Sequence, residues 1–555
     1  MGVHMRMTRS LAGLATVAML ALVLAPGPAG AQPAPPPLWG QAVPVSNQVA
    51  SSPVLGGGYH TPDGAYLPGR CGPGMMNSNR SESWIAVKPG TEDLVGTSKF
   101  FFDRYSTFYN FHLGSYTILG GQPAGNNQVQ GYECTTVGTQ AMPPSWTHNT
   151  DPNVDFDTKG RAYQVTLPFN AYWENMHPNG AIDISYSDDM GRHWVKGNGG
   201  RDLEQSPNSS SLSFGHVEDK QWVAVNNIPG NAYQDHVYAA WAVFNGSATV
   251  VRMAISRDRG QTFSPAVTIS APAQVGPAVT YVYPSVDAAG NVYVSVVSFP
   301  PSGKASSIYV ARSEDDGRTW SPFTIAVRNV GILPAAALPN TTFRDGIVES
   351  FAASRTYPGH LYLTYEDWDG AQFDVYFTQS TDGGTTWADP TLVNDNAQPA
   401  TTDQFQPSVA EGPGGAVAVA FYDRRATCPD DPSVLPAHIG RANFCIDVSV
   451  QVYRDSGQGA QTVGANDRAS SFTWDPQNPA QHVGGLGQMA CASHDYPCRL
   501  SFIGDYFGLA VSASNVYVLS VSTHYPSTVT ADEGGLVYYQ QQVLSSISRT
   551  ALGIG

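Results

Sequence analysis

Carboxylates, arginines and aromatic residues gather in short segments of this chain and are its best candidates for chemistry. They occupy loops that follow β-strand-like segments and also the first residues of such segments. The loops are Phe101–Tyr105, Tyr172–Glu174, Glu366–Asp369 and Asp423–Arg425, and the segment starts are Asp151, Asp219, Glu349, Gln406, Asp505 and Tyr506. Rings stack on the apolar face of a sugar, while carboxylates and guanidinium groups bind its hydroxyl and acid groups. This combination indicates a polyhydroxylated ligand.

Composition and missing signatures narrow the classes of function. The chain has 45 acidic and 29 basic residues, and its net charge of −16 argues against nucleic acid and anionic membranes as partners. The Gly-x-Ser-x-Gly, Gly-x-x-x-x-Gly-Lys and His-Glu-x-x-His signatures do not occur in the sequence. The acidic pairs Asp367/Asp369 and Asp430/Asp431 would suit calcium, but no EF-hand spacing accompanies them. We therefore expect no metal and no cofactor.

A turn motif of the form Ser-x-Asp-x-Gly-x-Thr-Trp recurs along the chain. Its copies begin at Ser187, Ser256, Ser313 and Ser380, with a worn fifth copy at Asp455 and Gly457. The Ser hydroxyl and Asp carboxylate can cap backbone N–H groups, the Gly supplies a positive φ, and the Trp or Phe buries a ring where the next strand begins. The copies start about 57 to 69 residues apart. This spacing is too long for one hairpin and predicts a propeller of repeated sheets.

Short β-branched and aromatic segments fill the chain between these turns. Seven pairs of first and second strands can be recognised, beginning near Trp84, Asp151, Trp222, Tyr283, Glu349, Gln406 and Tyr506. No segment beyond the N-terminal apolar run has helical periodicity over three turns. We therefore predict an all-β fold, a single β-propeller of four-stranded antiparallel blades, with seven blades favoured and six as the alternative. Either Gln41–Asn47 or the run Gly535–Val543 is expected to close the ring, which leaves no long bare edge.

The N-terminal region has the features of an exported protein. Arg6 and Arg9 precede an apolar run and the small residues Ala29–Ala31, which is typical of a secretory signal peptide. The apolar run is too short to span a membrane comfortably. The expected division is a signal peptide over 1–31, a Pro-rich leader with a candidate closing strand over 32–48, and the propeller over 49–555. The prediction is a secreted, extracellular and monomeric protein.

Six cysteines in an exported chain predict three disulfides. Sequence proximity favours Cys428–Cys445 and Cys491–Cys498, which leaves Cys71–Cys134. The segment Cys491–Cys498 also contains a histidine, but a zinc site would lack its fourth ligand there. The residues between Cys428 and Cys445 are expected to form an insertion that the disulfide stiffens into a wall of the cleft.

The boxes and strand pairs together resemble the sialidase-type, Asp-box (BNR-repeat) β-propeller superfamily, and the likeness covers nearly all of the mature chain. In that superfamily the box lies between the third and fourth strands, on the face opposite the active site, so we interpret the boxes as structural. The first strands line the central channel, and the loops after the second strands rise over the active-site face. The resemblance therefore implies that the carboxylates, arginines and rings named above lie on one face.

The resemblance also implies catalytic roles for three residues. Tyr506 opens the sequence Tyr-Phe-Gly-Leu, which is similar to the family's Tyr-Ser-x-Leu at the start of the last blade, and would be the nucleophile. Asp103 would donate the proton to the leaving oxygen, and Glu349 would activate the tyrosine. A neutral tyrosine avoids the repulsion that a carboxylate nucleophile would meet from an anionic sugar.

Further residues are implied for substrate binding. Arginines would clamp a substrate carboxylate through paired hydrogen bonds, and rings and a further carboxylate would contact the sugar. The expected residues are Arg80, Arg424, Arg425, Arg499, Trp173, Trp368 and Asp151.

The sequence departs from the family's pattern at two places. Asn79–Glu82 is not the family's Phe/Tyr-Arg-Ile-Pro, and Gln406 stands before Pro407 where the family has Asn-Glu-Pro. Glu349, with Asp403 behind it, is the substitute for the missing glutamate. The leading hypothesis is a secreted glycoside hydrolase resembling exo-sialidases, which cleaves terminal sugars, acidic ones favoured, from extracellular glycans. The rivals are a non-catalytic propeller that binds glycan or protein through its top face and a propeller-type polysaccharide lyase.

Overall fold

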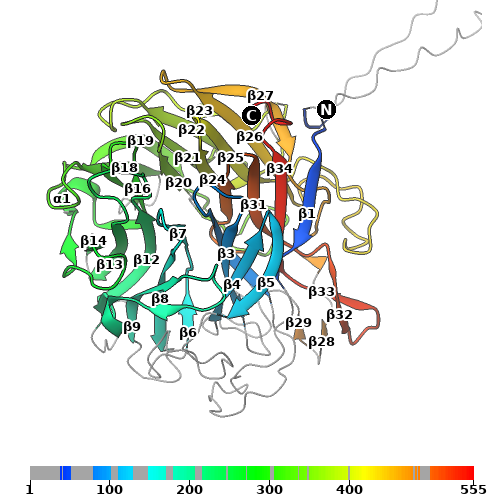
Figure 1. The fold of residues 1–555 in the computed structure, drawn as a ribbon. Helices are drawn as coiled ribbons and strands as arrows, with labels where there is room; N and C mark the ends of the chain where they lie inside the picture. The colour runs from blue at the N-terminus through cyan, green and yellow to red at the C-terminus, as the bar shows by residue number, and fades with distance from the viewer. Residues whose placement is uncertain are drawn as a thin grey trace, which may run out of the picture. The chain divides into compact units, whose positions relative to one another are not determined.

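Seven sheets stand around a common axis in the computed structural model of the protein (Figure 1). The structure describes residues 38–40, 42–51, 79–101, 111–128, 148–170, 179–206, 216–245, 248–270, 272–299, 305–334, 337–346, 349–397, 401–478, 482–483, 486–487 and 501–555. The innermost strand of each sheet contacts the innermost strands of its two neighbours, and those of the first and last sheets also meet. The fold is thus a seven-bladed β-propeller. The prediction of seven blades is confirmed, and the alternative of six is wrong.

Six of the blades are four-stranded and antiparallel, and in five of these six consecutive strands run outward from the axis. Blade 1 is β2 (Arg80–Val87), β3 (Leu94–Phe101), β4 (Phe111–Leu119) and β5 (Gln122–Gln128). Blade 3 is β12 (His216–Val225), β13 (Val237–Asn245), β14 (Ala248–Ser256) and β15 (Val267–Thr268). Blade 4 is β16 (Ala278–Val286), β17 (Val292–Phe299), β18 (Ala305–Ser313) and β19 (Thr324–Gly331).

The remaining blades follow the same plan with small variations. Blade 5 is β20 (Glu349–Ala353), β21 (Leu361–Trp368), β22 (Phe373–Ser380) and β23 (Thr391–Leu392), and blade 6 is β24 (Gln404–Gly412), β25 (Ala416–Asp423), β26 (Asp447–Asp455) and β27 (Ala460–Arg468). Blade 2 has split inner and outer strands, and its members are β6 (His148–Thr150), β7 (Asp155–Phe156), β8 (Ala162–Asn170), β9 (Asn179–Ser187), β10 (Val195–Lys196) and β11 (Glu204–Gln205).

Blade 7 combines strands from the two ends of the described chain. Its order is β30 (Gly508–Val511), β31 (Asn515–Ser522), β34 (Gln541–Ser548) and β1 (Val45–Val49). β1 pairs antiparallel with β34 from Val45 opposite Ile547 to Val49 opposite Val543, and Figure 1 shows the two strands side by side in blue and red. The closing strand overlaps the first of the two candidate segments, whereas Gln541–Val543 of the second belongs to the third strand of the blade.

A few short elements lie outside the blades. Among the described residues they are the hairpin β28 (His482–Val483) with β29 (Leu486–Gly487), the hairpin β32 (Pro526–Thr530) with β33 (Leu536–Tyr538), the 3-10 helix η1 (Asn198–Gly200) and the single-turn helix α1 (Pro272–Val275). Over the residues that the structure describes, no helix has the length and apolar character needed to cross a membrane.

The four Asp boxes form the turns between third and fourth strands, as the sequence predicts. In each box the serine Oγ accepts a hydrogen bond from the glycine N–H at 2.8–3.0 Å, and the aspartate accepts one from the N–H four residues later at 2.8–2.9 Å. The glycines Gly191, Gly260, Gly317 and Gly384 have φ between 74° and 82°. Third strands end where first strands end, so these turns define one end of the propeller, here called the Asp-box face. The opposite end, where the inner strands begin, is the strand-start face.

Polar contacts at the Asp-box face join neighbouring blades. Asp316, in the box of blade 4, accepts hydrogen bonds from the Tyr238 hydroxyl at 2.8 Å and from Arg257 Nε at 2.6 Å, and it contacts His236 Nδ1 at 2.8 Å. Asp455 of the worn fifth box contacts His360 and Tyr362 of blade 5 in the same way. These buried carboxylates therefore fasten each of two blades to the preceding one.

Apolar side chains fill the spaces between blades. Ala240 and Val251 of blade 3 belong to one buried cluster with Val279 and Val294 of blade 4. Burying a side chain of this size stabilises a fold by about 1.5–3 kcal/mol. The interfaces between blades, in addition to the ladders within them, therefore stabilise the ring.

The disulfide Cys428–Cys445 is present and closes the insertion between β25 and β26. This confirms one of the three predicted cysteine pairs. The pairs Cys71–Cys134 and Cys491–Cys498 lie outside the described residues.

Replacing Asp316 by Asn should destabilise the propeller by about 1–3 kcal/mol, because the buried Tyr238 hydroxyl, the half-buried His236 and the exposed Arg257 then lose a carboxylate acceptor. Burial alone would raise the pKa of Asp316, but bonds from His236, Tyr238 and Arg257 lower it below its usual range. Above pH 4, roughly the pKa of an aspartate in the unfolded chain, ionised Asp316 contributes its whole stabilisation to the folded state. This stabilisation is lost as pH falls through the lower pKa that Asp316 has in the folded protein. Urea unfolding at pH 7 and pH 3.5 measures both effects.

The control for this prediction is Asp188→Asn. The Asp188 side chain is 61% exposed and pairs with Arg161, so its loss should cost less than about 1 kcal/mol. Equal destabilisation by the two substitutions would contradict the role assigned to Asp316.

Candidate functional site

Several inner strands begin with residues in a backbone conformation that L-amino acids rarely adopt. Positive φ angles occur at Glu82 (48°), Asp151 (53°), Lys220 (50°), Tyr281 (53°) and Gln406 (46°), one in each of five blades. A left-handed conformation costs about 1–2 kcal/mol for a residue with a side chain. Strain of this kind is concentrated at functional sites. Its repetition marks the strand-start face as the candidate site.

A β-bulge accompanies the strain in four of these blades. In blade 1 the pairing with the second strand shifts between Ser81 and Trp84, and equivalent shifts occur around Lys220, Tyr281 and Gln406. A bulge inserts an unpaired residue and re-aims its side chain. At each bulge, one side chain at the start of an inner strand therefore departs from the regular alternation of side chains between the two faces of the sheet.

Charged side chains at this face form a continuous chain of ion pairs, here called the axial cluster. Its members are Glu82, Lys99, Asp151, Lys220, Arg344 and Asp505. Acidic and basic members alternate along the chain of contacts. They come from blades 1, 2 and 3 and from the segments that precede blades 5 and 7, so the cluster joins parts of the ring that are far apart in sequence.

Lys99 links blades 1 and 2 within the axial cluster. Its Nζ lies 2.6 Å from Glu82 Oε2 and 3.8 Å from Asp151 Oδ1, and it donates to Thr150 Oγ1 at 3.2 Å. The Thr150 hydroxyl in turn donates to Asp151 Oδ1 at 2.7 Å. Asp151, predicted as a substrate-binding residue, is thus held in place on one side by a lysine and a threonine.

Asp505 is held by two cations. Lys220 Nζ lies 2.8 Å from Asp505 Oδ2 and 3.6 Å from Asp151 Oδ2. Arg344 forms a paired contact with the Asp505 carboxylate, Nε to Oδ1 at 3.1 Å and Nη2 to Oδ2 at 2.7 Å. One ammonium group therefore bridges the carboxylates of Asp151 and Asp505, which brings two acids from different blades close together.

The carboxyl groups around Lys220 fall into two protonation classes. Burial alone would raise the pKa of Asp505, but Arg344 and Lys220 lower it far below its usual range, and Lys220 does the same for Asp151. Burial raises the pKa of Asp219 to about 6, and the nearby Asp151 adds to the rise despite the attraction of Lys220. Asp219 is also partly exposed. An acid that keeps its proton below about pH 6 therefore interacts with two carboxyl groups that stay ionised there, an arrangement that separates acid from base roles.

A second polar group surrounds Gln406. Its Nε2 donates to Asp345 Oδ1 at 3.1 Å and to the Gly504 carbonyl at 2.8 Å, and its backbone N–H donates to Glu366 at 2.6 Å. Burial raises the pKa of Asp345 to about 8. In the described part of the chain, no group of three or more His, Cys, Asp or Glu residues is arranged to hold a metal ion.

Aromatic rings close the axis beneath the axial cluster and are here called the aromatic plug. Its members are Trp84, Trp222, Tyr283 and Tyr506. The ring of Trp222 packs edge-to-face against the other three at centroid distances of 4.6 to 5.0 Å. The plug separates the strand-start face from the rest of the axis.

The structure places Tyr506 and Glu349, two of the three predicted catalytic residues, in or beside this plug. The Tyr506 hydroxyl donates to the Pro152 carbonyl at 3.3 Å, and burial raises the pKa of Tyr506 well above its usual range. Burial also raises the pKa of Glu349 well above its usual range, which keeps it neutral, and burial raises the pKa of Tyr283. Among the described residues, the Tyr506 hydroxyl makes no hydrogen bond to a carboxylate.

Two of the predicted arginines are fully buried. Arg424 pairs with Asp403 at 2.8 Å and donates to the Pro339 carbonyl at 2.9 Å. Burial lowers the pKa of Arg424 to about 10, although Asp403 opposes the shift. Arg80 lies over the Tyr116 ring at 6.0 Å. Both guanidinium groups are within the wall of the propeller.

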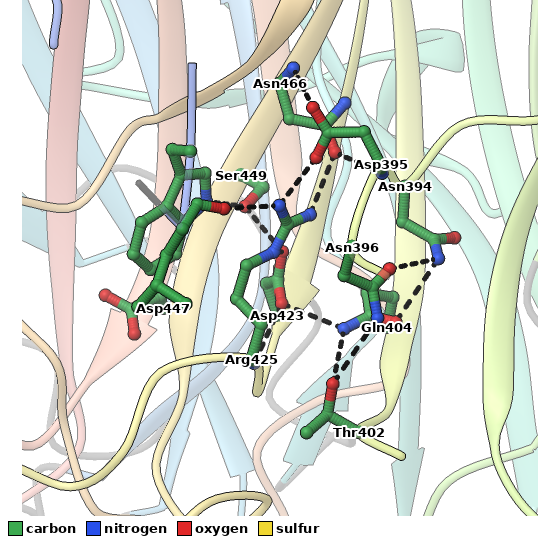
Figure 2. A network of polar contacts seen from close by, with 12 residues as sticks. Asn394, Asp395, Asn396, Thr402, Gln404, Asp423, Arg425, Asp447, Ser449 and Asn466 are labelled. Atoms are coloured by element: carbon green, nitrogen blue, oxygen red, sulfur yellow. Dashed lines mark hydrogen bonds and ion pairs between the residues drawn. The ribbon is translucent and has the colours of Figure 1, made fainter. Parts of the chain in front are cut away.

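Arg425 lies in a separate polar network at the end of blade 6 (Figure 2). Its Nε donates to Asp423 at 2.7 Å, Nη1 to Asp395 at 2.6 Å and Nη2 to Asn466 at 2.8 Å. Nη1 also donates to the Leu38 carbonyl at 2.9 Å. The Trp39 ring contacts the guanidinium groups of Arg425 and of a second arginine, and its indole N–H donates to a serine in β26. Arg425 therefore holds the N-terminal segment against blade 6.

The remaining predicted residues have different outcomes. Trp368 is half-buried and packs edge-to-face against Phe373 at 5.3 Å, at the end of β21. Asp103, Arg499 and Trp173 lie outside the described residues. Of the predicted set, the structure brings Asp151, Tyr506 and Glu349 together around the axis.

Sequence reasoning missed most of the axial cluster. Glu82 and Lys220 of the cluster, and Tyr281 beside it, are not among the predicted site residues, although each stands two residues before an inner-strand aromatic residue. That recurrent offset is the signal that could have found them. Lys99 and Arg344 carry no comparable signal, because they come from a second strand and from a connecting segment.

Comparisons with known proteins give distant structural likenesses. No protein-family model and no curated protein sequence matches the chain. An α-L-arabinofuranosidase from Fusarium graminearum matches with a TM-score of 0.37 and 12% identity over 72% of this chain and 93% of the other. The Hadza microbial sialidase Hz136 matches with a TM-score of 0.35 and 14% identity over 71% and 66% of the two chains.

A third solved structure, the NanB sialidase from Streptococcus pneumoniae, matches with a TM-score of 0.36 and 11% identity over 86% of this chain and 69% of the other. Likenesses at this level say nothing about the site. The fold itself follows from the blade topology, in which seven sheets surround one axis.

Replacing Lys220 by Met should destabilise the protein by about 3–5 kcal/mol at pH 7, because Asp151 and Asp505 are then left as neighbouring buried carboxylates without the bridging ammonium. Lys159→Met is the control, since that lysine is 61% exposed and pairs with Asp235 at 3.7 Å. The measurement is chemical unfolding of both variants. A Lys220→Met variant as stable as the control would show that the ion pairs of the axial cluster do not depend on this lysine.

Proposed function

We propose that the protein is a glycoside hydrolase whose acid and base are carboxyl groups at the strand-start face of the axis. The observation that supports this most directly is the pairing of a partly exposed, proton-holding Asp219 with the ionised Asp151 and Asp505 around one lysine. Glycoside hydrolysis uses such a pair, in which one carboxyl group protonates the leaving oxygen and the other activates water or attacks the sugar.

The proposed roles follow from protonation state and exposure. Asp219 donates its proton to the glycosidic oxygen as the bond to the anomeric carbon breaks. The carboxylates of Asp505 and Asp151 stabilise the positive charge that develops on the sugar, and a water molecule then adds to the anomeric carbon as the ionised Asp219 takes up its proton. Lys220 and Arg344 hold Asp505 ionised throughout.

This proposal assigns Tyr506 a supporting role. Its hydroxyl faces a backbone carbonyl and its burial opposes ionisation, so the tyrosine forms part of the floor beneath the reacting groups. Tyr281 is partly exposed beside the axial cluster, with Lys220 Nζ 5.3 Å from its ring centre. A ring in this position suits stacking on a sugar face.

An extracellular location accompanies the proposal. The Cys428–Cys445 disulfide is the kind of bond that persists in oxidising compartments. The N-terminal signal-like segment supports the same location. The partners proposed are therefore extracellular glycans.

Gln406 supports a second candidate function. A carboxamide occupies the position where the resemblance expects a glutamate, and it is bound to Asp345 and to a carbonyl group. An uncharged residue there suits a propeller that binds a glycan at the same face without cleaving it. In that case glycan binding is measurable by calorimetry and no sugar is released.

The Asp219→Asn variant should lower turnover by about 10²–10⁴-fold, because the leaving oxygen loses its proton donor. The assay uses fluorogenic aryl glycosides of a sialic acid, a uronic acid and neutral sugars. Asp467→Asn is the matched control, since burial and Asp395 raise the pKa of Asp467 to about 6 as well, but that residue lies on the outer strand β27. No turnover of any glycoside by the wild type, or equal activity of both variants, would reject the hydrolase.

The protonation of Asp219 should also determine whether the rate rises or falls with pH. Because its pKa is raised to about 6, the acid form is present below that value and is lost above it. The rate at low substrate concentration should therefore fall as pH rises through about 6. Initial rates between pH 4 and 8 test this expectation, and a rate that rises over the same range would assign Asp219 a basic role.

A further inference from the structure

A ring of small side chains surrounds the axis on the other side of the aromatic plug. It consists of Ala86, Ala224, Ser285, Ala353, Ala410 and Ala510, each from the inner strand of a different blade. Side chains of this size cannot meet across the axis, and they leave a cavity of about 130 Å³. The plug residues Trp84 and Trp222 form one end of this cavity.

The other end of the cavity carries three charged side chains from blades 2, 5 and 6. Arg355 Nη2 lies 3.2 Å from Asp155 Oδ2, and Arg355 Nε lies 3.9 Å from Glu411 Oε1. Arg355 follows β20 in a turn whose Gly359 carbonyl accepts a hydrogen bond from Gly383 of an Asp box. The charged end therefore opens toward the Asp-box face, away from the proposed catalytic site.

Polar groups at this end have unused hydrogen-bonding capacity. The Glu411 side chain is only 7% exposed, and its Oε2 is buried and has no hydrogen-bond partner among the described residues. Within the same part of the chain, Nη2 is the only nitrogen of the Arg355 guanidinium that donates a hydrogen bond. Leaving a buried polar atom unsatisfied costs about 1–3 kcal/mol. A bound molecule with an acceptor group would remove this cost.

We propose that this axial cavity binds a small aliphatic monocarboxylate that enters from the Asp-box face. Its carboxylate would accept hydrogen bonds from Arg355 and from the Glu411 carboxyl group, and its alkyl part would lie among the alanine methyl groups. A guanidinium group recognises a carboxylate through paired hydrogen bonds. A cation is disfavoured because Arg355 already neutralises Asp155, and the size of the cavity limits the ligand to a few heavy atoms.

The protonation of Glu411 gives the proposed site a pH dependence. Burial raises the pKa of Glu411 to about 7, which Arg355 partly opposes and Asp155 reinforces. These two residues are the charged groups that face Glu411. Below pH 7 the neutral acid can donate to the ligand, whereas above pH 7 its negative charge repels a carboxylate. Binding should therefore weaken as pH rises.

The test is the melting temperature of the full chain with increasing acetate, propionate and butyrate at constant ionic strength. A ligand that binds the folded state alone raises the melting temperature with concentration. We expect saturable increases at pH 6, smaller ones at pH 8, and none with propionamide or chloride. Arg355→Gln should weaken the apparent affinity by about tenfold or more, whereas Arg318→Gln, at a 59% exposed arginine of the same face, should leave it unchanged.

A second variant keeps the test independent of charge. Ala224→Val narrows the cavity and should abolish the response to butyrate before that to acetate. An equal response in Arg355→Gln, an equal effect of chloride, or no response at any concentration would overturn the proposal and leave a cavity filled by water. None of these outcomes bears on the hydrolase, whose assay is made at the opposite face.

Discussion

Seven inner strands share one axis, and the side chains that they send toward it have to fit in the same narrow space. This constraint orders the centre of the protein into layers. The strand-start end holds alternating charges, the middle holds interlocked rings, and the Asp-box end holds alanines around a cavity. Strand residues two apart point to the same face, so Trp84 and Ala86 of blade 1 contribute to the successive middle and Asp-box layers, whereas the bulge directs Glu82 into the charged layer.

The charged layer is stable because its charges neutralise one another in fixed geometry. Taking carboxylates and ammonium groups out of water costs several kcal/mol for each ion, and mutual attraction offsets this only when contacts are close and complete. Bulges provide that closeness by directing residues such as Lys220 out of the ladder and into contact with two acids. The strained backbone at the bulges thus positions the alternating charges. Charges fixed in advance in this way stabilise the charge that develops on a sugar as its glycosidic bond breaks.

The fold could be predicted from the sequence because it repeats. Each Asp box carries a local signal, and the inner strands reveal themselves through residues such as Trp84, Trp222 and Tyr283, so the number of blades could be counted. The site could be predicted only in part. Asp151 and Asp505 stand at strand starts and were recognised there, whereas the partners that set their charge, Lys220 and Arg344, depend on bulges and long-range contacts that leave little trace in local sequence.

The arginines show why residue type alone misleads. Arg424 and Arg425 sit side by side at the end of a second strand, where a ligand-binding role is reasonable, yet both guanidinium groups already bond to neighbours in the wall of the propeller. Nothing in the two-residue sequence distinguishes a guanidinium that awaits a ligand from one already bound to Asp403 or Asp423. That distinction comes from the packing of blade 6 against the N-terminal segment.

The origin of the outermost strand of blade 7 has a consequence for biosynthesis. Val45–Val49 is synthesised long before its partner β34 (Gln541–Ser548), because six blades lie between them in the sequence. During synthesis the early strand is an unpaired edge, a state that invites pairing with other chains. The pairing of β1 with β34, which completes blade 7, must therefore follow the synthesis of the other blades. A factor that covers β1 until then would increase the fraction of new chains that fold correctly.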